Sequence, residues 1–213
     1  MHLRPGLSHI PAWAPALALA ALLAAAPARA AEGNGSPFYG AARLGAYVPI
    51  SAELDRFGTG FDVALAVGWW ATPSLSLELA AGRGTVSGPA GFSTGAEPPV
   101  TGTPVDVRLT LFPVSLTARW AFWLGDFRPY LLAGSGVWVV RARPEVRLPG
   151  NGVFSTEWTE AALGFQAGLG LVYQADARVA FGAEARWLRA RVRHDREIGL
   201  DGLTGVVTME YRL

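Results

Sequence analysis

The chain repeats a period-two alternation of side chains eight times, and this repeat restricts the available folds more than any other feature. In the clearest stretch, 203–213, Met209 and Tyr211 at odd positions alternate with Glu210 and Arg212 at even ones. Because successive side chains of a β-strand point to opposite faces, this stretch predicts a strand with one apolar and one polar face. An even number of such strands is what an up-and-down antiparallel barrel requires.

The eight predicted strands differ in how regular the alternation is. They cover residues 38–48, 61–69, 75–81, 105–122, 129–141, 160–173, 179–187 and 203–213. In the fourth, the apolar residues change from odd to even positions at Phe112 and Pro113, which predicts a β-bulge. Before this change, its apolar face is predicted to hold Val105, Val107, Leu109 and Leu111. The fifth is the least polar strand, and its apolar face is predicted to hold Tyr130, Leu132, Trp138 and Val140, with Ser135 and Arg141 opposite.

The predicted connections alternate between short and long. Short turns are expected at 71–74, 124–127 and 174–177, and long loops at 49–60, 83–103, 143–156 and 194–202. Short turns at one end and long loops at the other are typical of outer-membrane barrels, whose short turns face the periplasm.

The N-terminus predicts export. Arg4 precedes an apolar run over 16–26, and Ala28-Arg29-Ala30 forms a cleavage site, so residues 1–30 are predicted to be a cleaved signal peptide. Residues 31–213 are then expected to form one barrel domain, without cysteine and therefore without disulfides. They hold 16 of the 18 basic and all 17 acidic residues, a formal charge of −1 that gives no bias toward nucleic acid.

Aromatic residues give a test that does not depend on periodicity. Those assigned to the apolar face near the short turns are Phe38, Trp69, Trp120, Phe122, Tyr130, Tyr173, Phe181 and Tyr211. Those near the long loops are Phe61, Trp138 and Trp187. Two aromatic belts are typical of a membrane barrel, because amphipathic rings are favoured at the headgroup level. The apolar faces are therefore predicted to point outward into lipid and the polar faces inward.

Two segments carry a family resemblance. Residues 127–136 (FRPYLLAGSG) and 207–213 (VTMEYRL) are similar to a strand start and to the last strand of small eight-stranded bacterial outer-membrane barrels. The family is that of the OmpA transmembrane domain, OmpX and OmpW. The resemblance implies a bacterial outer-membrane location and a C-terminal signal, including Tyr211 and Leu213, that the barrel-assembly machinery recognises during insertion. This signal usually ends in Phe or Trp rather than Leu.

The inward face is predicted to carry a network of charges. Its members are Arg43, Asp62, Glu78, Arg119, Glu160, Glu184, Arg186, Glu210 and Arg212. Because side chains fill the interior of an eight-stranded barrel, these groups are expected to pair with one another as a plug. A proton pathway, a narrow pore, and an OmpW-like route for small hydrophobic molecules remain alternatives, the last supported by the weakly polar fifth strand.

Surface residues suggest further roles. Arg189, Arg191 and Arg193 continue the outward parity beyond the belt, near Arg141, Arg143 and Arg147, and lipopolysaccharide phosphates are a possible partner. Solvated loop stems are the alternative. The loop at 83–103 is either a binding segment or disordered. His194 has no nearby serine, so a lipid A-modifying enzyme is disfavoured, and we predict a non-enzymatic monomer without metal or cofactor.

Overall fold

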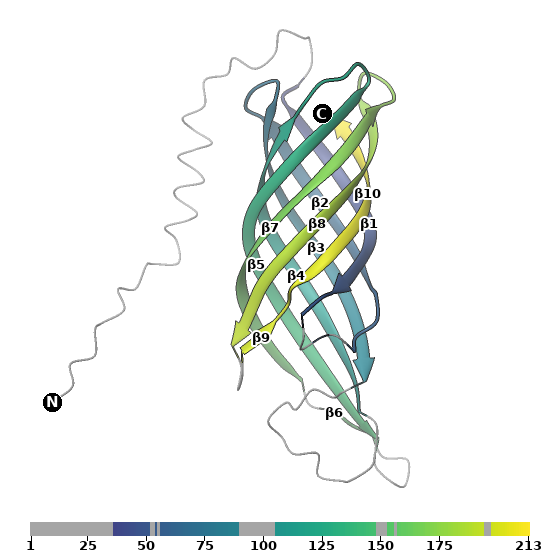
Figure 1. Ribbon diagram of the computed structural model, residues 1–213, viewed down its shortest axis with the longest axis vertical. Coiled ribbons are helices and arrows are strands. Elements are labelled where there is room, and N and C mark those ends of the chain that lie inside the picture. Colours follow the sequence, from purple (N-terminus) through teal and green to yellow (C-terminus); the bar gives the residue numbers. More distant parts are fainter. Residues whose placement is uncertain are drawn as a thin grey trace, which may run out of the picture.

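The computed structural model describes residues 36–51, 54, 56–89, 105–147, 153–155, 157–193 and 197–213. These residues form a closed antiparallel barrel (Figure 1). Its long strands are β1 (Phe38–Pro49), β2 (Gly60–Trp70), β3 (Leu75–Pro89), β4 (Val105–Ala121), β5 (Phe127–Arg147), β7 (Trp158–Gln174), β8 (Val179–Arg193) and β10 (Gly202–Arg212). The short strands β6 (Val153–Ser155) and β9 (Glu197–Gly199) pair with β5 and β8. The predicted signal peptide, 1–30, lies outside the described residues.

The barrel closes where the last strand meets the first. β10 pairs with β1, from Tyr39 opposite Arg212 to Pro49 opposite Gly202, and with β8 on its other side. Each long strand therefore has two neighbours, which removes the unpaired edges that an open sheet would present. The predicted eight-stranded up-and-down barrel is confirmed. In the described parts of the chain, no helix has the length and apolar character needed to cross a membrane.

The two ends of the barrel differ, as the connection lengths predict. Short turns lie at 71–74, 122–126 and 175–178, at the end that carries the C-terminus (Figure 1). In the last of these, the Asp176 carboxylate accepts the backbone N–H groups of Arg178 and Val179 at 2.6 and 2.8 Å. These bonds hold the pKa of Asp176 below its usual range. At the opposite end β3 continues to Pro89, so the predicted loop 83–103 begins as strand, and 90–104 lies outside the described residues.

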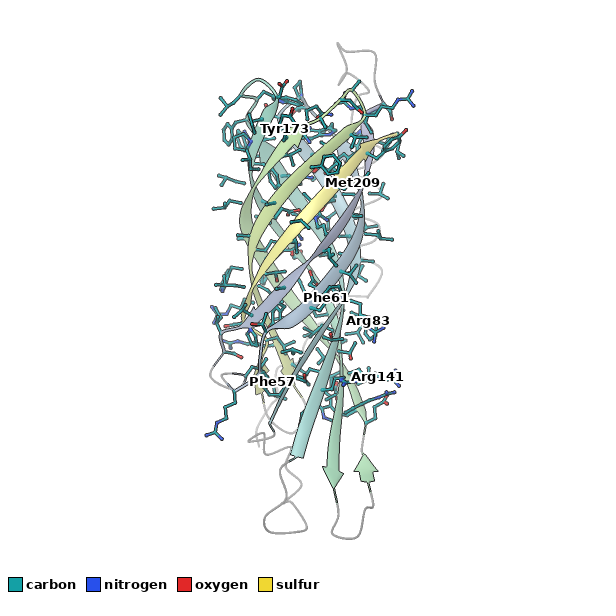
Figure 2. All side chains as sticks on the ribbon, turned by 90° about the vertical axis from the view of Figure 1, so that its right-hand side faces the viewer. Phe57, Phe61, Arg83, Arg141, Tyr173 and Met209 are labelled. Atoms are coloured by element: carbon teal, nitrogen blue, oxygen red, sulfur yellow. The ribbon has the colours of Figure 1, made fainter. Side chains whose placement is uncertain are left out.

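An apolar band covers the outer face over the half of the barrel nearer the short turns (Figure 2). Leu65, Leu163 and Phe165 in this band are 68%, 79% and 68% exposed. Aromatic residues predicted for the belts also point outward, among them Phe38, Trp69, Trp120, Phe122, Tyr173, Phe181, Tyr211, Phe61 and Trp187. A water-soluble barrel has the opposite arrangement, because it does not expose so many large apolar side chains on its outer surface.

The β-bulge predicted at Phe112 and Pro113 is wrong. Ala81 lies opposite Val114 and Gly84 lies opposite Leu111, so the register between β3 and β4 is the same on both sides of Phe112 and Pro113. The register between β4 and β5 is also continuous along the whole strand. Odd positions of β4 from 107 to 121 therefore point inward, and Val107, Leu109 and Leu111 are buried in the interior rather than on the outer face. The side chain of Val105 lies outside the described residues.

The face prediction for the fifth strand is also wrong. Tyr130, Leu132, Trp138 and Val140 are all buried inside the barrel. Leu131 and Val137, on the alternate positions of β5, are exposed on the outer face. Tyr130 and Trp138 therefore do not belong to the aromatic belts.

One physical cause explains the errors at the long-loop ends of β4 and β5: the strands extend beyond the apolar band, and there the polarity of both faces is inverted. At the long-loop end the outer face carries Arg83, Arg108 and Arg189, while the interior is apolar. The interior residues there form a loop-end cluster of Tyr47, Leu54, Phe57, Val86, Val107, Leu109, Leu111, Trp138, Val140, Ala142, Ala162, Leu188, Ala190, Val192, Ile198 and Leu200. Past the band the barrel therefore resembles a water-soluble protein with an apolar core.

Interior tyrosines lie flat against glycines of neighbouring strands. A Cβ added to Gly68 would lie 2.0 Å from Cζ of Tyr39, and one added to Gly170 would lie 2.3 Å from Cζ of Tyr130. No real side chain tolerates such a contact, so each ring occupies the space that a side chain would fill. Glycine at these positions allows large rings to pack inside a narrow barrel.

Candidate functional site

The interior between the short turns and the loop-end cluster contains a continuous chain of alternating arginines and glutamates. In order of contact it runs Arg128, Glu210, Arg119, Glu78, Arg43, Glu184 and Arg186, and we call it the ion-pair network. These residues come from β1, β3, β4, β5, β8 and β10. Each glutamate contacts two arginines, so the barrel wall is cross-linked through its interior.

Arg43 lies at the centre of the network. Its Nη2 is 2.6 Å from Oε2 of Glu78 and its Nε is 2.6 Å from Oε1 of Glu184. The side chains of Arg43 and Glu78 are 2% and 0% exposed. Charges this deeply buried require close partners, because the cost of removing an ion from water is otherwise several kcal/mol.

Arg119 extends the network across the full width of the barrel. Its Nη2 lies 2.6 Å from Oε1 of Glu210, and Nη1 lies 3.4 Å from Oε2 of Glu78. In the closed strand order, β4 and β10 are separated by three long strands in either direction. The bond between Arg119 and Glu210 therefore joins opposite walls. Two phenol rings support this guanidinium: Tyr39 accepts a 3.0 Å hydrogen bond from Nη1, and the Tyr130 ring centroid lies 4.0 Å from Cζ.

At the short-turn end the network finishes on two neighbouring tryptophan rings. Arg128 pairs with Glu210, and its Cζ lies 4.9 Å from the ring centroid of Trp70 and 5.1 Å from that of Trp123. The indole Nε1 of Trp123 donates a 2.8 Å hydrogen bond to the Pro73 carbonyl in the neighbouring turn. Cation–π contacts with the two rings hold the arginine at this end of the interior.

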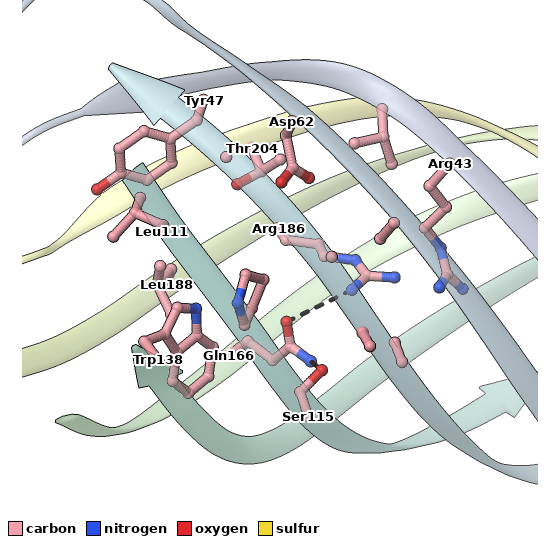
Figure 3. A pocket seen from close by; sticks show the side chains of 17 residues that line it. Arg43, Tyr47, Asp62, Leu111, Ser115, Trp138, Gln166, Arg186, Leu188 and Thr204 are labelled. Atoms are coloured by element: carbon pink, nitrogen blue, oxygen red, sulfur yellow. Dashed lines mark hydrogen bonds between the residues drawn. The ribbon is translucent and has the colours of Figure 1, made fainter. Parts of the chain in front are cut away.

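Toward the middle of the barrel the network continues into neutral polar groups. Arg186 donates from Nε and Nη2 to Oε2 of Glu184, at 2.9 and 2.6 Å, and from Nη1 to Oε1 of Gln166 at 3.4 Å. The amide nitrogen of Gln166 then donates to the hydroxyls of Thr117 and Ser115, at 2.6 and 3.1 Å. Figure 3 shows the bonds from Gln166 to Arg186 and to Ser115.

A cavity of about 60 Å³ lies between the network and the loop-end cluster (Figure 3). Its polar wall includes Arg43, Asp62 and Arg186. Its other wall is formed by Tyr47, Leu111, Trp138 and Leu188 of the loop-end cluster. A cavity of this size has room for a few water molecules against its polar wall, since one water needs roughly 10–15 Å³.

The loop-end cluster closes the interior on the long-loop side of this cavity. Leu54 and Phe57, from the connection between β1 and β2, are buried within it, and Gly58 N donates to the Ser87 carbonyl at 3.1 Å. The Tyr47 hydroxyl donates to the Leu200 carbonyl at 3.0 Å on the other side. Packed apolar side chains, rather than charges, therefore occupy the barrel at this level.

The structure places six of the predicted inward charges in the network: Arg43, Glu78, Arg119, Glu184, Arg186 and Glu210. Asp62 is also inward and lines the cavity. Glu160 lies half-buried on the inward face of β7, opposite Val140. Arg212 is half-buried at the short-turn end, where it forms no ion pair with any described residue.

Sequence reasoning missed Arg128 and Tyr130, which hold one end of the network. Both occupy even positions of β5, the strand whose faces were predicted the wrong way round. The signal that could have found Arg128 is its position directly before the Pro129 strand start, on the parity of Tyr130. A charge on that face is difficult to reconcile with contact to lipid.

The outward residues singled out from the sequence lie at both ends. Arg189 and Arg191 are exposed at the long-loop end, with Nε of Arg189 3.9 Å from Oδ2 of Asp201. The side chain of Arg193, and all of His194, lie outside the described residues. At the other end Tyr211 points outward, and Leu213 N donates to the Phe38 carbonyl at 3.0 Å. The described residues contain no group of three or more His, Cys, Asp or Glu that could hold a metal ion.

Comparison with known proteins supports the fold. The chain has the architecture of small eight-stranded outer-membrane β-barrels. It is similar to Neisserial surface protein A (17% identity, 85% of this chain and 100% of that one, TM-score 0.51). It is also similar to OprG from Pseudomonas aeruginosa (13%, 85% and 98%, TM-score 0.51) and to a major outer membrane protein from Thermus thermophilus (12%, 83% and 99%, TM-score 0.52). No family model and no curated protein matches the chain.

Proposed function

We propose that this protein is a non-enzymatic integral protein of the bacterial outer membrane, with an interior that is closed to solutes. The apolar band on its outer face supports the membrane location, since such a surface is stable only against lipid. The fold shared with outer-membrane barrels of known structure is consistent with it. On this proposal the protein reaches the outer membrane by export through a signal peptide at 1–30.

The observation that carries the closed interior is the ion pair between Arg119 and Glu210, which joins opposite walls at 2.6 Å. The loop-end cluster closes the interior at the long-loop end, and Arg128 with its two tryptophan rings closes it at the short-turn end. A pore would have to break several buried ion pairs and also displace packed apolar side chains. A plug therefore fits the geometry better than a conducting pathway.

The absence of an enzymatic role is part of the proposal. Glu78, Glu184 and Glu210 are each engaged by two arginines, so none of them is a free acid or base for catalysis. The hydroxyls of Ser115 and Thr117 accept hydrogen bonds from Gln166, which is not a base.

The proposed partners follow from the two surfaces. Outer-membrane lipids surround the apolar band, and lipopolysaccharide contacts the loop end, where Arg189, Arg191 and Arg193 continue β8. The barrel-assembly machinery recognises the last strand during insertion, through a signal that includes Tyr211 and Leu213. The protein functions as a monomer on this proposal, because closure of the barrel satisfies its edge strands internally.

Two measurements test the proposal together. After expression in a Gram-negative host, the protein should fractionate with the outer membrane and migrate faster on a gel when it is not boiled. Purified protein in liposomes should give no swelling in isotonic solutions of small sugars, whereas a general porin measured alongside should. Recovery in the soluble periplasmic fraction would contradict the location, and sugar-dependent swelling would contradict the closed interior.

A further inference from the structure

Three arginines gather on the outer face just beyond the apolar band. Arg141 and Arg143 follow one another on the outward face of β5, and Arg108 of β4 lies directly opposite Arg143. We call these three residues the arginine cluster. Arg108 and Arg143 are exposed, and Figure 2 shows Arg141 on the extended part of the wall, beyond the level of Phe61.

A single carboxylate orients two of these arginines. Glu157, just before β7, accepts the Nε–H group of Arg141 on one oxygen and that of Arg143 on the other, the latter at 2.7 Å. These hydrogen bonds hold the pKa of Glu157 below its usual range. Both guanidinium groups are thus held through Nε, and their Nη nitrogens make no hydrogen bond within the described residues. Each guanidinium group therefore presents its two Nη nitrogens, which can bind an oxyanion through two hydrogen bonds.

Among the side chains that the structure describes, those of the cluster and its neighbours carry more positive than negative charge. Three arginines surround one glutamate, and Arg108 forms neither a hydrogen bond nor an ion pair with any described residue. Like charges directly opposite each other on a sheet are destabilising. The pairing of Arg108 with Arg143 is therefore an arrangement that a bound anion would stabilise.

The height of the cluster identifies the source of that anion. Outward positions of β5 are apolar or small over 131–139, which matches the roughly 9–11 residues that a strand needs to cross the hydrocarbon core. Phe112 lies opposite Val139 at the edge of this stretch, and the next outward pair is Thr110 with Arg141. The cluster follows immediately, at the level of the lipid headgroups.

We propose that Arg108, Arg141 and Arg143, oriented by Glu157, bind a phosphoryl group of a lipid headgroup, specifically a phosphate of lipid A. The proposal rests on the proposed outer-membrane location and adds a defined site to it. The contact suggested by the sequence centred on Arg189, Arg191 and Arg193 of β8, with Arg141 and Arg143 as neighbours. The structure instead defines a site on β4 and β5, to which Arg108 and Glu157 are added. Binding at this site requires the paired Nη groups of arginine rather than positive charge alone, and this distinction can be tested.

The first test measures binding in detergent micelles by calorimetry. The probes are lipid A with its phosphates, the same lipid A after dephosphorylation, and inorganic phosphate. We expect phosphorylated lipid A to bind, and the double variant Arg141→Ala with Arg143→Ala to weaken it about tenfold or more, the effect of losing one or two charge-assisted hydrogen bonds. Arg178→Ala, which removes an exposed arginine at the opposite end, should leave affinity unchanged.

The second test uses Glu157→Gln, for which two explanations predict opposite changes in the affinity for lipid A. This substitution raises the local positive charge, so attraction by charge alone predicts tighter binding. Loss of the orienting carboxylate predicts weaker binding, which is our expectation, and Arg143→Lys should also weaken it because the ammonium lacks the fork.

Each remaining outcome overturns the proposal. Equal affinity for dephosphorylated lipid A would exclude a phosphate site, and inorganic phosphate bound as tightly as lipid A would exclude a lipid ligand. Unchanged binding in the double variant would exclude this site, and tighter binding of Glu157→Gln would exclude orientation as its basis. Because micelle binding is independent of cellular location and of pore closure, such failures would leave the proposed function standing.

Discussion

Arg119 and Glu210 form an ion pair of 2.6 Å between opposite walls of the barrel, although 91 positions separate them in the chain. Arg119 also contacts the rings of Tyr39 and Tyr130, and Glu210 also pairs with a second arginine, Arg128. A contact across the diameter both closes the interior and holds the two walls together. The same residues therefore set the stability of the barrel and its permeability.

Removal of Arg119 should destabilise the barrel strongly. Arg119→Ala leaves Glu78 and Glu210 each with one arginine fewer in a buried site, and breaking such a pair typically costs about 3–5 kcal/mol. The free energy of unfolding can be measured by urea titration of the protein refolded in lipid vesicles. Arg83→Ala, which removes an exposed arginine on the outer face of β3, should change stability by less than about 0.5 kcal/mol. Equal effects of the two substitutions would show that the network does not contribute to stability.

Two interior glycines should respond differently to the same added methyl group. Gly68→Ala forces a Cβ to within 2.0 Å of the Tyr39 ring, so we expect a loss of about 1–3 kcal/mol from overpacking. A Cβ at Gly84 would lie 3.6 Å from Asp62 Oδ1, an ordinary contact, so Gly84→Ala should be nearly neutral. Urea unfolding of the two variants in the same vesicles compares them directly. A neutral Gly68→Ala would contradict the packing of Tyr39 against this glycine.

Quenching by brominated lipids tests the face assignments of Trp120 and Trp138. Trp120 is exposed on the outer face, whereas Trp138 is buried inside. Replacing Trp120 with Phe should therefore reduce the fraction of fluorescence that acyl-chain bromines quench, and replacing Trp138 with Phe should increase it. The reverse result would restore the outward orientation of Trp138 that the sequence predicts.

The sequence predicted the number of strands, their order and the faces of most of them, because the outer face is apolar and the inner face polar over the band. At the long-loop ends of β4 and β5 it failed for one physical reason. Where these strands leave the band, the outer face becomes polar at Arg108 and Arg141, and the interior becomes apolar at Leu109 and Trp138. A period-two pattern shows which residues share a face, but it does not show which face is inside once both environments change.

The candidate site was predictable in part for the same reason. Arg43, Glu78 and Glu184 lie on strands with a clear polar face, so their inward position followed from the alternation. Their pairing did not, because Arg43 meets Glu184 across β10, and such contacts depend on strand stagger and barrel curvature. Arg128 was missed because its strand has two nearly apolar faces.

Glu157 should titrate below the ordinary glutamate range. Its pKa is lowered by hydrogen bonds from Arg141 and Arg143, so its midpoint, followed by carbon NMR of the carboxyl group in micelles, should lie below about 4.3. A lowered folded-state pKa gives stability that is present above the unfolded pKa and lost as the pH falls through the folded one.

A double variant provides the control for this titration. Arg141→Ala with Arg143→Ala should return the midpoint of Glu157 toward about 4.3. Asp176, whose pKa is lowered instead by backbone N–H groups at the opposite end, should not change. A Glu157 midpoint that stays low in the double variant would show that the two arginines are not its partners.

Single-channel recording in planar lipid bilayers tests the closed interior most directly. With the ion-pair network and the loop-end cluster in place, we predict that the folded protein, inserted and verified by its heat-modifiable migration, gives no discrete conductance steps in concentrated potassium chloride. Reproducible steps of uniform size from the folded protein would contradict a closed interior.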